Sequence, residues 1–283
     1  MEVKVAKTAG FCFGVKRAVD MALACAGEDT PVYTLGDIIH NETVVGELKE
    51  KGIMPIYELS EFKDLPKGKV IIRSHGVTRA AEKELKDLGF EIVDATCPFV
   101  KKIHNLVDEH SKDPANKILI IGDKDHPEVQ GICGWCNSDP IIIANEQEAL
   151  DYSKNKGLKH IIVTQTTFNL TKMKGIVEIL EKKSYDIIVL NTICNATELR
   201  QAEAEELAGQ VDCMIVIGGK NSSNTQKLYD ICIKKCVDTY YIQTLVDLDL
   251  TTIRSFRCVG ITAGASTPKN IIEEVQKHVR NEF

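Results

Sequence analysis

One recurring pattern restricts the fold of this chain: a short apolar run rich in β-branched residues, then a polar or glycine-rich loop, then an amphipathic stretch. Apolar runs that end in such loops lie at 69–76, 117–126, 160–167, 213–224 and 258–266. Near-continuous apolar strands alternating with amphipathic helices are typical of parallel sheets covered by helices. The sequence therefore predicts an α/β protein that binds its ligand beyond the carboxyl ends of the strands, where the polar loops fall.

Three cysteines occupy the same place in this pattern. Each follows an apolar run and precedes an amphipathic helical stretch, and they recur at near-equal spacing: Cys12, Cys97 and Cys194. A motif shared at a near-constant period indicates a structural repeat. We expect three pseudo-equivalent α/β lobes with one cysteine each, the C-terminal segment packing back on the first lobe. The expected lobes are 1–96, 97–193 and 194–283.

Composition narrows the class of protein. The 283 residues are 43% hydrophobic and 27% charged, as in ordinary globular proteins, and the formal net charge is -6. Proteins that bind nucleic acid or a membrane surface need a basic excess, so we expect neither partner. The N-terminal stretch alternates like a strand, unlike a signal peptide, and no apolar run approaches the roughly 18 residues of a membrane span. A cytoplasmic protein is expected.

Ten cysteines are many for such a chain and indicate metal, redox or catalytic use of some of them. A thiol at a helix N-terminus is favoured as the thiolate, and three such thiolates could hold a metal centre with one open position. That centre could be zinc completed by a histidine, or an iron–sulfur cluster with one Lewis-acidic iron. Cys133 and Cys136 form a C-x-x-C that could be a redox pair, half a zinc site or two structural residues.

Polar side chains capable of holding an anion follow the other apolar runs. Histidines, hydroxyls, an amide and glycine-rich backbone together favour a phosphate or diphosphate, with charge supplied by imidazolium. Each residue also has a structural interpretation, because a histidine can satisfy a backbone carbonyl and a serine can cap a helix. The candidates are His40, His75, His126, Glu128, Thr166, Thr167, Ser222, Ser223, Asn224 and Ser266.

Nine motifs occur in order across essentially the whole chain, and together they resemble the 4-hydroxy-3-methylbut-2-enyl diphosphate reductases, the last enzymes of the methylerythritol phosphate route to isoprenoids. They read GFCFGVKRAV, HNETVV, RSHGVT, DATCPFVKKIH, HPEVQG, TQTT, ICNATELRQ, GGKNSSNTQKL and TAGAST. The resemblance implies a trefoil of three α/β lobes around one [4Fe–4S] cluster. Residues matching Cys12, Cys97 and Cys194 would ligate it and leave one iron without a protein ligand.

The same resemblance implies the reaction and the role of each site residue. An allylic diphosphate would lose its hydroxyl by reduction with two electrons and two protons, giving isopentenyl and dimethylallyl diphosphates. The implied catalytic residues are Glu128, Thr166, Thr167 and His126. The implied substrate-binding residues are His40, His75, His126, Thr166, Ser222, Ser223, Asn224 and Ser266.

No dinucleotide fingerprint follows the first predicted strand, so a ferredoxin or flavodoxin is expected as the electron donor. Two alternatives stay open. A quinolinate-synthase-like enzyme also has three lobes with one cysteine each, but it binds small carboxylates and should use arginine, whereas Arg73 is the arginine found at a strand end. The second alternative is a non-catalytic zinc or cluster protein that senses redox state or binds a phosphorylated ligand. Asp125 departs from the family pattern, in which glycine precedes the histidine.

Overall fold

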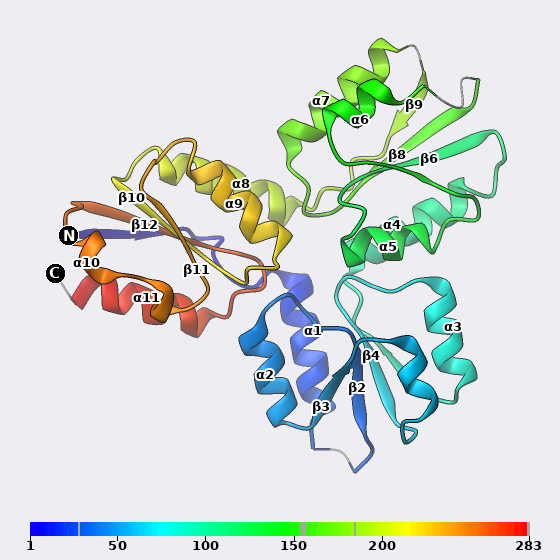
Figure 1. Cartoon of the computed structure of the whole chain (residues 1–283), viewed down its shortest axis with the longest axis horizontal. Coiled ribbons are helices and arrows are strands. Elements are labelled where there is room, and N and C mark those ends of the chain that lie inside the picture. The colour runs from blue at the N-terminus through cyan, green and yellow to red at the C-terminus, as the bar shows by residue number, and fades with distance from the viewer. Residues whose placement is uncertain (28, 154–156, 184, 282–283) are drawn as a thin grey trace. The chain divides into compact units, whose positions relative to one another are not determined.

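The computed structural model describes residues 1–27, 29–153, 157–183 and 185–281. These residues form two compact units, one made of Met1–Lys16, Ile39–Glu47 and Asn195–Phe283, the other of Arg17–Ile38 and Leu48–Cys194. The described strands form three four-stranded sheets, and every pairing is parallel (Figure 1). The predicted α/β class is confirmed.

We number the sheets I, II and III along the chain. Sheet I contains β2 (Val32–Leu35), β3 (Ile53–Ile56), β4 (Lys69–Ile72) and β5 (Glu91–Asp94). Sheet II contains β6 (Asn116–Ile121), β7 (Ile141–Ile143), β8 (Lys159–Thr164) and β9 (Asp186–Val189). Sheet III contains β10 (Cys213–Ile217), β11 (Thr239–Ile242), β12 (Cys258–Ala263) and β1 (Glu2–Val5).

Helices connect the strands. Around sheet I the chain forms α1 (Phe13–Ala24), α2 (Glu42–Glu50), the 3-10 helix η1 (Leu59–Lys63) and α3 (Arg79–Asp87). Around sheet II it forms α4 (Pro98–His110), α5 (Pro127–Cys133), α6 (Glu146–Asp151) and α7 (Leu170–Lys182). Around sheet III it forms α8 (Asn195–Ala208), α9 (Ser223–Cys232), η2 (Leu245–Asp247), α10 (Leu250–Ile253) and α11 (Lys269–Asn281).

The three sheets share one strand order. Sheets I and II run β3-β2-β4-β5 and β7-β6-β8-β9, so the second strand lies outside the first, and the third and fourth follow on the other side. Sheet III runs β11-β10-β12-β1, which is the same order with the N-terminal strand in fourth place. This supports the repeat, but β1 pairs outside the 1–96 segment in which it was expected. The lobe boundaries themselves stay a prediction.

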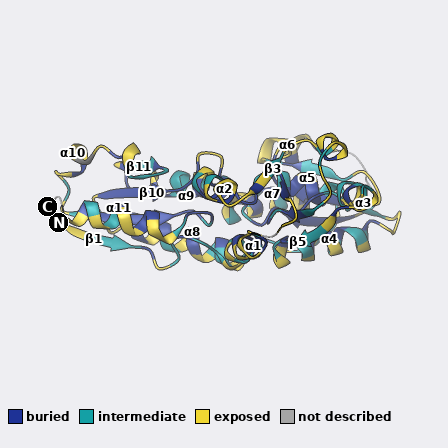
Figure 2. Cartoon of the chain, turned by 90° about the horizontal axis from the view of Figure 1, so that it is seen from below, coloured by how far each residue is buried: buried dark blue, intermediate teal, exposed yellow. Residues whose placement is uncertain are grey.

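Alternating strand residues build the cores of sheets II and III. In sheet III, Ile215 and Ile217 face Val275 of α11, whereas Met214 and Val216 face α8 and α9 on the other side. Sheet II is covered in the same way, by α6 and α7 on one face and by α4 and α5 on the other (Figure 1). The central strand β10 is buried along its whole length (Figure 2). Such two-sided burial explains the near-continuous apolar runs.

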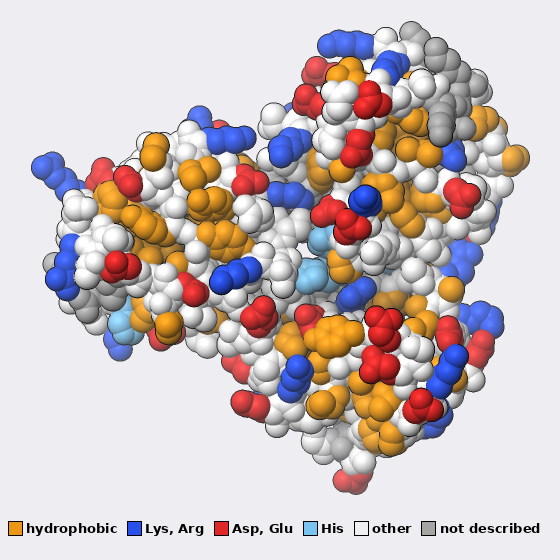
Figure 3. Space-filling model, in the orientation of Figure 1, with side chains coloured by type: hydrophobic (Ala, Val, Ile, Leu, Met, Phe, Trp, Pro, Cys, Tyr) orange, Lys and Arg blue, Asp and Glu red, His pale blue; other side chains and the backbone are white. Residues whose placement is uncertain are grey.

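The surface carries charges of both signs. Figure 3 shows acidic and basic side chains interspersed over the face in view. Interspersed charge fits the modest net charge of -6 and gives a polyanion no extended basic surface on this face. Among the described helices, none combines the length and the apolar character that crossing a membrane requires.

Candidate active site

The predicted site residues follow the two central strands of each sheet. In the shared strand order, the first strand of a repeat lies beside the third, and the chain leaves these neighbours in opposite directions. Open α/β sheets bind ligands at such reversal points. The loops and helix starts that follow these strands contain His40 and His75 for sheet I, His126, Glu128, Thr166 and Thr167 for sheet II, and Ser222, Ser223, Asn224 and Ser266 for sheet III.

The three predicted cysteine ligands occupy equivalent positions. Each follows the fourth strand of a sheet, is partly exposed, and directly precedes a helix, namely α1, α4 or α8. The main-chain N–H of each donates to a carbonyl in the loop after the third strand of the same sheet. The pairs are Cys12 with Ala265 at 3.2 Å, Cys97 with Ser74 at 2.9 Å and Cys194 with Thr166 at 3.0 Å. One local structure therefore holds all three thiols.

Six other cysteines have thiols whose pKa is raised by burial. Burial raises the pKa of Cys136, Cys213 and Cys232 to about 12. Burial also raises the pKa of Cys133, Cys236 and Cys258. A thiol that keeps its proton is a poor metal ligand, because the thiolate is the ligating form. The three partly exposed thiols at helix starts are thus a donor set that fits an iron–sulfur cluster better than these six.

Glu128 and Thr166 form the closest polar contact of the sheet II loops. The Thr166 main-chain N–H donates to Glu128 Oε1 at 2.6 Å, and the Thr166 hydroxyl donates to Oε2 at 2.7 Å. Glu128 is 1% exposed, at the start of α5. Pairing both carboxylate oxygens compensates for their burial and links the carboxyl group to a hydroxyl that can pass on a proton.

The side chain of His126 caps α5. Its Nδ1 accepts the main-chain N–H of Glu128 at 3.1 Å, so Nδ1 carries no proton and Nε2 presents the N–H. The ring is neutral in this contact, so the imidazolium charge that the sequence predicted for the anion site would require the cap to open at His126. The ring of His75 lies edge-on to it, with ring centroids 5.4 Å apart. These two histidines can act on one ligand.

Thr167 is held by a different partner. The Gln165 side chain donates to the Thr167 hydroxyl at 3.0 Å and accepts the Asp123 main-chain N–H at 3.1 Å. Gln165 therefore joins the loop after β8 to the loop after β6. Asp125, the departure from the family pattern, is exposed, and its N–H donates to Asp123 in a local turn.

The serine hydroxyls of the sheet III loops form hydrogen bonds within their own unit. Ser222 accepts the Thr225 N–H as the cap of α9, and Ser223 accepts from Lys227 at 2.7 Å. Ser266 donates to the carbonyl oxygen of His40 at 3.0 Å. A Cβ on Gly219 would lie 2.7 Å from that same oxygen, so the close approach requires glycine. Capping and ligand binding can coexist, since a hydroxyl has both donor and acceptor capacity.

The side-chain amide of Asn224 is buried and unpaired among the described residues. The residue is 5% exposed, and neither its amide oxygen nor its amide nitrogen has a hydrogen-bond partner among the described residues. An unpaired buried amide costs free energy, which a ligand with matching groups would recover. This observation favours the functional interpretation of the N-S-S-N segment over simple helix capping.

Two arginines that the sequence did not single out support the cysteine loops. The Arg200 guanidinium is buried and donates to the carbonyls of Thr8 and Gly10, just before Cys12. Arg17 donates to the carbonyls of Asp94 and Thr96, just before Cys97. Their place in the sequence could have indicated this role, because each arginine lies in the second turn of a helix that follows a cysteine.

His104 is a further buried histidine, on α4. Its ring stacks on Trp135, the one tryptophan of the chain, with centroids 5.3 Å apart and planes 13° apart. Burial, assisted by nearby Lys101 and opposed by Asp94, lowers the pKa of His104 to about 4. The folded protein thus holds a neutral imidazole against the indole near neutral pH.

We expect Trp135 emission to stay constant from pH 8 to about pH 5, because protonated imidazole quenches indole and His104 does not protonate in that range. The unfolded chain would take up this proton near pH 6.5, so the stability contributed by neutral His104 is complete above pH 6.5 and declines as the pH falls toward 4. Emission with a midpoint near pH 6.5 that disappears in His104→Phe would contradict the expectation.

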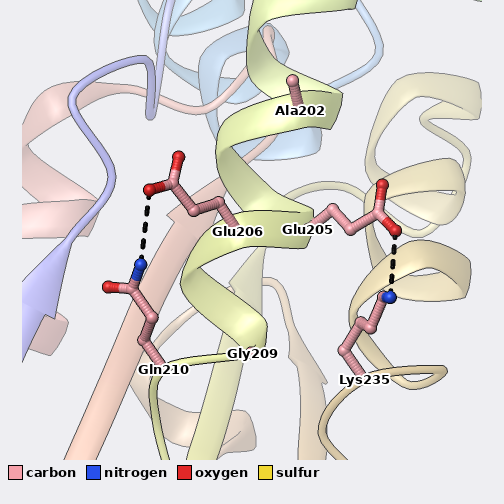
Figure 4. A pocket seen from close by; sticks show the side chains of 6 residues that line it. All are labelled: Ala202, Glu205, Glu206, Gly209, Gln210 and Lys235. Carbon is pink, nitrogen blue, oxygen red and sulfur yellow. Dashed lines mark hydrogen bonds and ion pairs between the residues drawn. The ribbon is translucent and has the colours of Figure 1, made fainter.

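One surface depression lies apart from these residues. It has a volume of about 400 Å³ and none of the predicted site residues lines it. Its lining includes Glu205, which pairs with Lys235 at 3.4 Å, and Glu206, which accepts from Gln210 at 3.3 Å (Figure 4). Lys235 neutralises Glu205, but Gln210 is uncharged and leaves Glu206 with its negative charge, which disfavours an anionic substrate here.

The fold and these side chains define a class: a parallel α/β protein of three repeated sheets with polar loops at the reversal points and a thiol after each fourth strand. The chain belongs to the LytB protein family, whose model matches residues 3–280. It is 47% identical to the 4-hydroxy-3-methylbut-2-enyl diphosphate reductase of Clostridioides difficile, covering 99% of this chain and 100% of the relative. It is 45% identical to the enzyme of that name from Caldanaerobacter subterraneus, covering 99% and 97%.

Solved structures agree with this assignment. The E-1-hydroxy-2-methyl-but-2-enyl-4-diphosphate reductase of Plasmodium falciparum is similar with a TM-score of 0.92 and 28% identity, covering 98% of this chain and 87% of that one. A structure described as (E)-4-hydroxy-3-methyl-but-2-enyl diphosphate reductase, the terminal enzyme of the non-mevalonate pathway, has a TM-score of 0.69 and 41% identity, covering 100% of both chains.

Proposed function

We propose that this chain is a 4-hydroxy-3-methylbut-2-enyl diphosphate reductase, the last enzyme of the methylerythritol phosphate route. It replaces the allylic hydroxyl of its substrate by hydrogen, consuming two electrons and two protons and releasing water, with isopentenyl and dimethylallyl diphosphates as products. The observation that carries the proposal is the equivalent placement of Cys12, Cys97 and Cys194 in a chain similar to these reductases over its full length. Anaerobic turnover of the allylic diphosphate tests it.

The three cysteines are proposed to hold a [4Fe–4S] cluster. When bound, the cluster would supply electrons one at a time and a Lewis-acidic iron. The loop carbonyls of Ala265, Ser74 and Thr166 fix the cysteine backbones, which presets the directions of the thiols. About four irons and four sulfides per chain are expected after anaerobic purification, whereas zinc would support the non-catalytic alternative.

Glu128 and Thr166 are proposed to supply the proton that leaves with the hydroxyl as water. A protonated Glu128 can pass its proton through the Thr166 hydroxyl, which bonds to Oε2 at 2.7 Å and can donate as it accepts. Burial of Glu128 keeps bulk water from replacing it in this relay. Thr167, held by Gln165, would orient the substrate hydroxyl.

The remaining site residues are proposed to bind the diphosphate. Asn224, with Ser222, Ser223 and Ser266 of the same unit, offers donors that match phosphate oxygens, and His126 offers its neutral Nε2–H. His40 and His75 complete the proposed set. Hydrogen bonds to a charged ligand contribute about 1.5–3 kcal/mol each.

We expect Asn224→Leu to weaken binding of inorganic diphosphate by about tenfold to a hundredfold with little loss of stability. Leucine has the same branched skeleton and removes an amide that is buried without a partner among the described residues, so we expect little cost to folding while the ligand loses its bonds. Calorimetric titration and thermal unfolding of the anaerobic holoenzyme measure both quantities.

Asn169 provides the matched control. It caps α7 by accepting the Lys172 N–H at 3.0 Å, so Asn169→Ala should lower stability by about 1 kcal/mol and leave diphosphate affinity unchanged. If Asn224→Leu binds diphosphate as tightly as the parent, the amide is not part of the site.

A ferredoxin or flavodoxin is proposed as the electron donor. The proposed location is the cytoplasm, where a reducing environment preserves thiols such as the partly exposed Cys133 and Cys136.

A further inference from the structure

His104 is a buried titratable residue to which the proposed chemistry gives no task. It is 1% exposed, and its Nε2 is buried with no hydrogen-bond partner among the described residues. A core position filled for packing would favour an apolar ring, because an unpaired buried nitrogen costs free energy. The surroundings of the His104 ring are therefore informative.

The ring of His104 touches the backbone of the two segments that carry proposed ligands. A Cβ placed on Gly76 would lie 2.6 Å from His104 Cε1, and Gly76 directly follows His75 with a positive φ of 73°. A Cβ placed on Gly131 would lie 3.5 Å from His104 Nε2 and 3.6 Å from the carbonyl oxygen of His75. The imidazole thus occupies the angle between the His75 turn and α5.

Helix α5 carries the other proposed site residues near His104, namely His126 and Glu128. It begins after His126, carries Glu128 in its first turn, and reaches Gly131 one turn after Glu128, on the same side of the helix. The rings of His75 and His126 face one another at 5.4 Å. The spacing between the His75 turn and α5 therefore sets how these two histidines face.

Trp135 stacks on the imidazole of His104. The indole N–H donates to the carbonyl of Val77 at 2.9 Å, two residues beyond His75, and the Arg79 and Lys101 cations lie 5.1 and 5.3 Å from the indole centroid. The stack of indole on imidazole fixes the ring plane of His104. The pair bridges α4, the end of α5 and the His75 turn.

We propose that His104 is a positioning residue for diphosphate binding, whose ring, clamped by Trp135 against Gly76 and Gly131, sets the orientation of His75 relative to His126. The inference rests on the proposed function in so far as His75 binds the substrate. The low pKa of His104 supports it, because a neutral ring adds no charge behind the anion site.

The test compares His104→Ala and His104→Phe with Ile103→Ala in the anaerobic holoenzyme. Ile103 is the neighbouring core residue of α4, 1% exposed, and packs with Val129 and Ile132 of α5, so it reproduces a cavity in the same helix. His104→Phe keeps an aromatic ring on Trp135 and removes the unpaired nitrogen, which offsets the strain of its larger ring, so this variant should still fold. The larger phenyl ring should nevertheless displace the backbone at Gly76, which directly follows His75.

Two readouts are expected to move together. The ring NMR signals of His75, in protein with labelled histidine, should shift in both His104 variants and stay in place in Ile103→Ala, with the partly exposed His278 of α11 as the internal reference. Affinity for inorganic diphosphate should fall about tenfold in both His104 variants, and His104→Ala should cost nothing further in a His75→Ala background.

The NMR and affinity measurements test the positioning role of His104 and the diphosphate assignment separately. His75 signals that stay unchanged in both His104 variants, or that shift equally in Ile103→Ala, overturn the positioning role. If the parent does not bind diphosphate, the substrate assignment fails, and the NMR comparison still decides whether His104 orients His75.

Discussion

Cys97→Ala is expected to lose its iron–sulfur cluster and, with it, all measurable reductase activity. Cys97 is proposed as one of three protein ligands, and two thiolates cannot hold a cluster that already has one iron without a protein ligand. The fold should survive, because the Cys97 side chain makes no capping hydrogen bond to α4 and its N–H contact with Ser74 does not depend on the side chain. Iron and sulfide analysis with the anaerobic visible spectrum measures the effect.

Cys133→Ala is the control for this prediction. Cys133 is also partly exposed, but burial raises the pKa of its thiol, and it lies at the end of α5 instead of the start of a helix. We expect full cluster content and near-parent turnover in this variant. Full iron content in Cys97→Ala would refute the three-cysteine centre, and cluster loss in Cys133→Ala would mean that the ligands were assigned wrongly.

Glu128→Gln is expected to retain the cluster and bind substrate almost normally while kcat falls by roughly 10²–10⁴-fold, the usual contribution of a positioned acid. Glutamine can preserve the local contacts, because its carbonyl oxygen can accept the Thr166 N–H and its NH2 group can donate to the Thr166 hydroxyl. What it loses is the proton. Rates should be measured with an artificial reductant in excess, so that electron delivery does not limit them.

Substitutions at Thr166 test whether its hydroxyl passes on the proton that Glu128 supplies. Thr166→Ser keeps the hydroxyl and should stay near parent turnover, whereas Thr166→Val keeps the shape and should fall toward Glu128→Gln. If Glu128→Gln turns over within about threefold of the parent, Glu128 does not supply the proton. The main-chain bond from Thr166 to Glu128 Oε1 is present in all of these variants, so the comparison isolates the hydroxyl.

Local pattern predicted much of the fold. Near-continuous apolar runs predicted strands covered on both faces. The strands β4, β10 and β12 lie within the runs quoted above, and β6 and β8 begin one residue before theirs. Strand pairing could not be predicted in the same way, because it joins segments far apart in sequence. The N-terminal strand shows this: β1 pairs with β12, so the repeat containing Cys12 is completed by the two ends of the chain.

The positions of the candidate residues were predictable to the extent that they depend on loop position. Every candidate lies in a loop or helix start after a strand, and Glu128 contacts Thr166 as a shared ligand site requires. The cap that His126 Nδ1 forms on α5 was not predicted, since it depends on the local backbone at the start of the helix. Arg17, Arg200 and His104 were missed because their roles depend on carbonyls and glycines that the fold brings to them.

Anaerobic turnover of the allylic diphosphate tests the central claim most directly. Protein containing about four irons and four sulfides per chain, supplied with excess artificial reductant, should convert the substrate to isopentenyl and dimethylallyl diphosphates that together equal the substrate consumed. Two electrons should be used per molecule converted. Cluster-loaded protein that leaves the substrate intact, or that forms other products, would contradict the assignment.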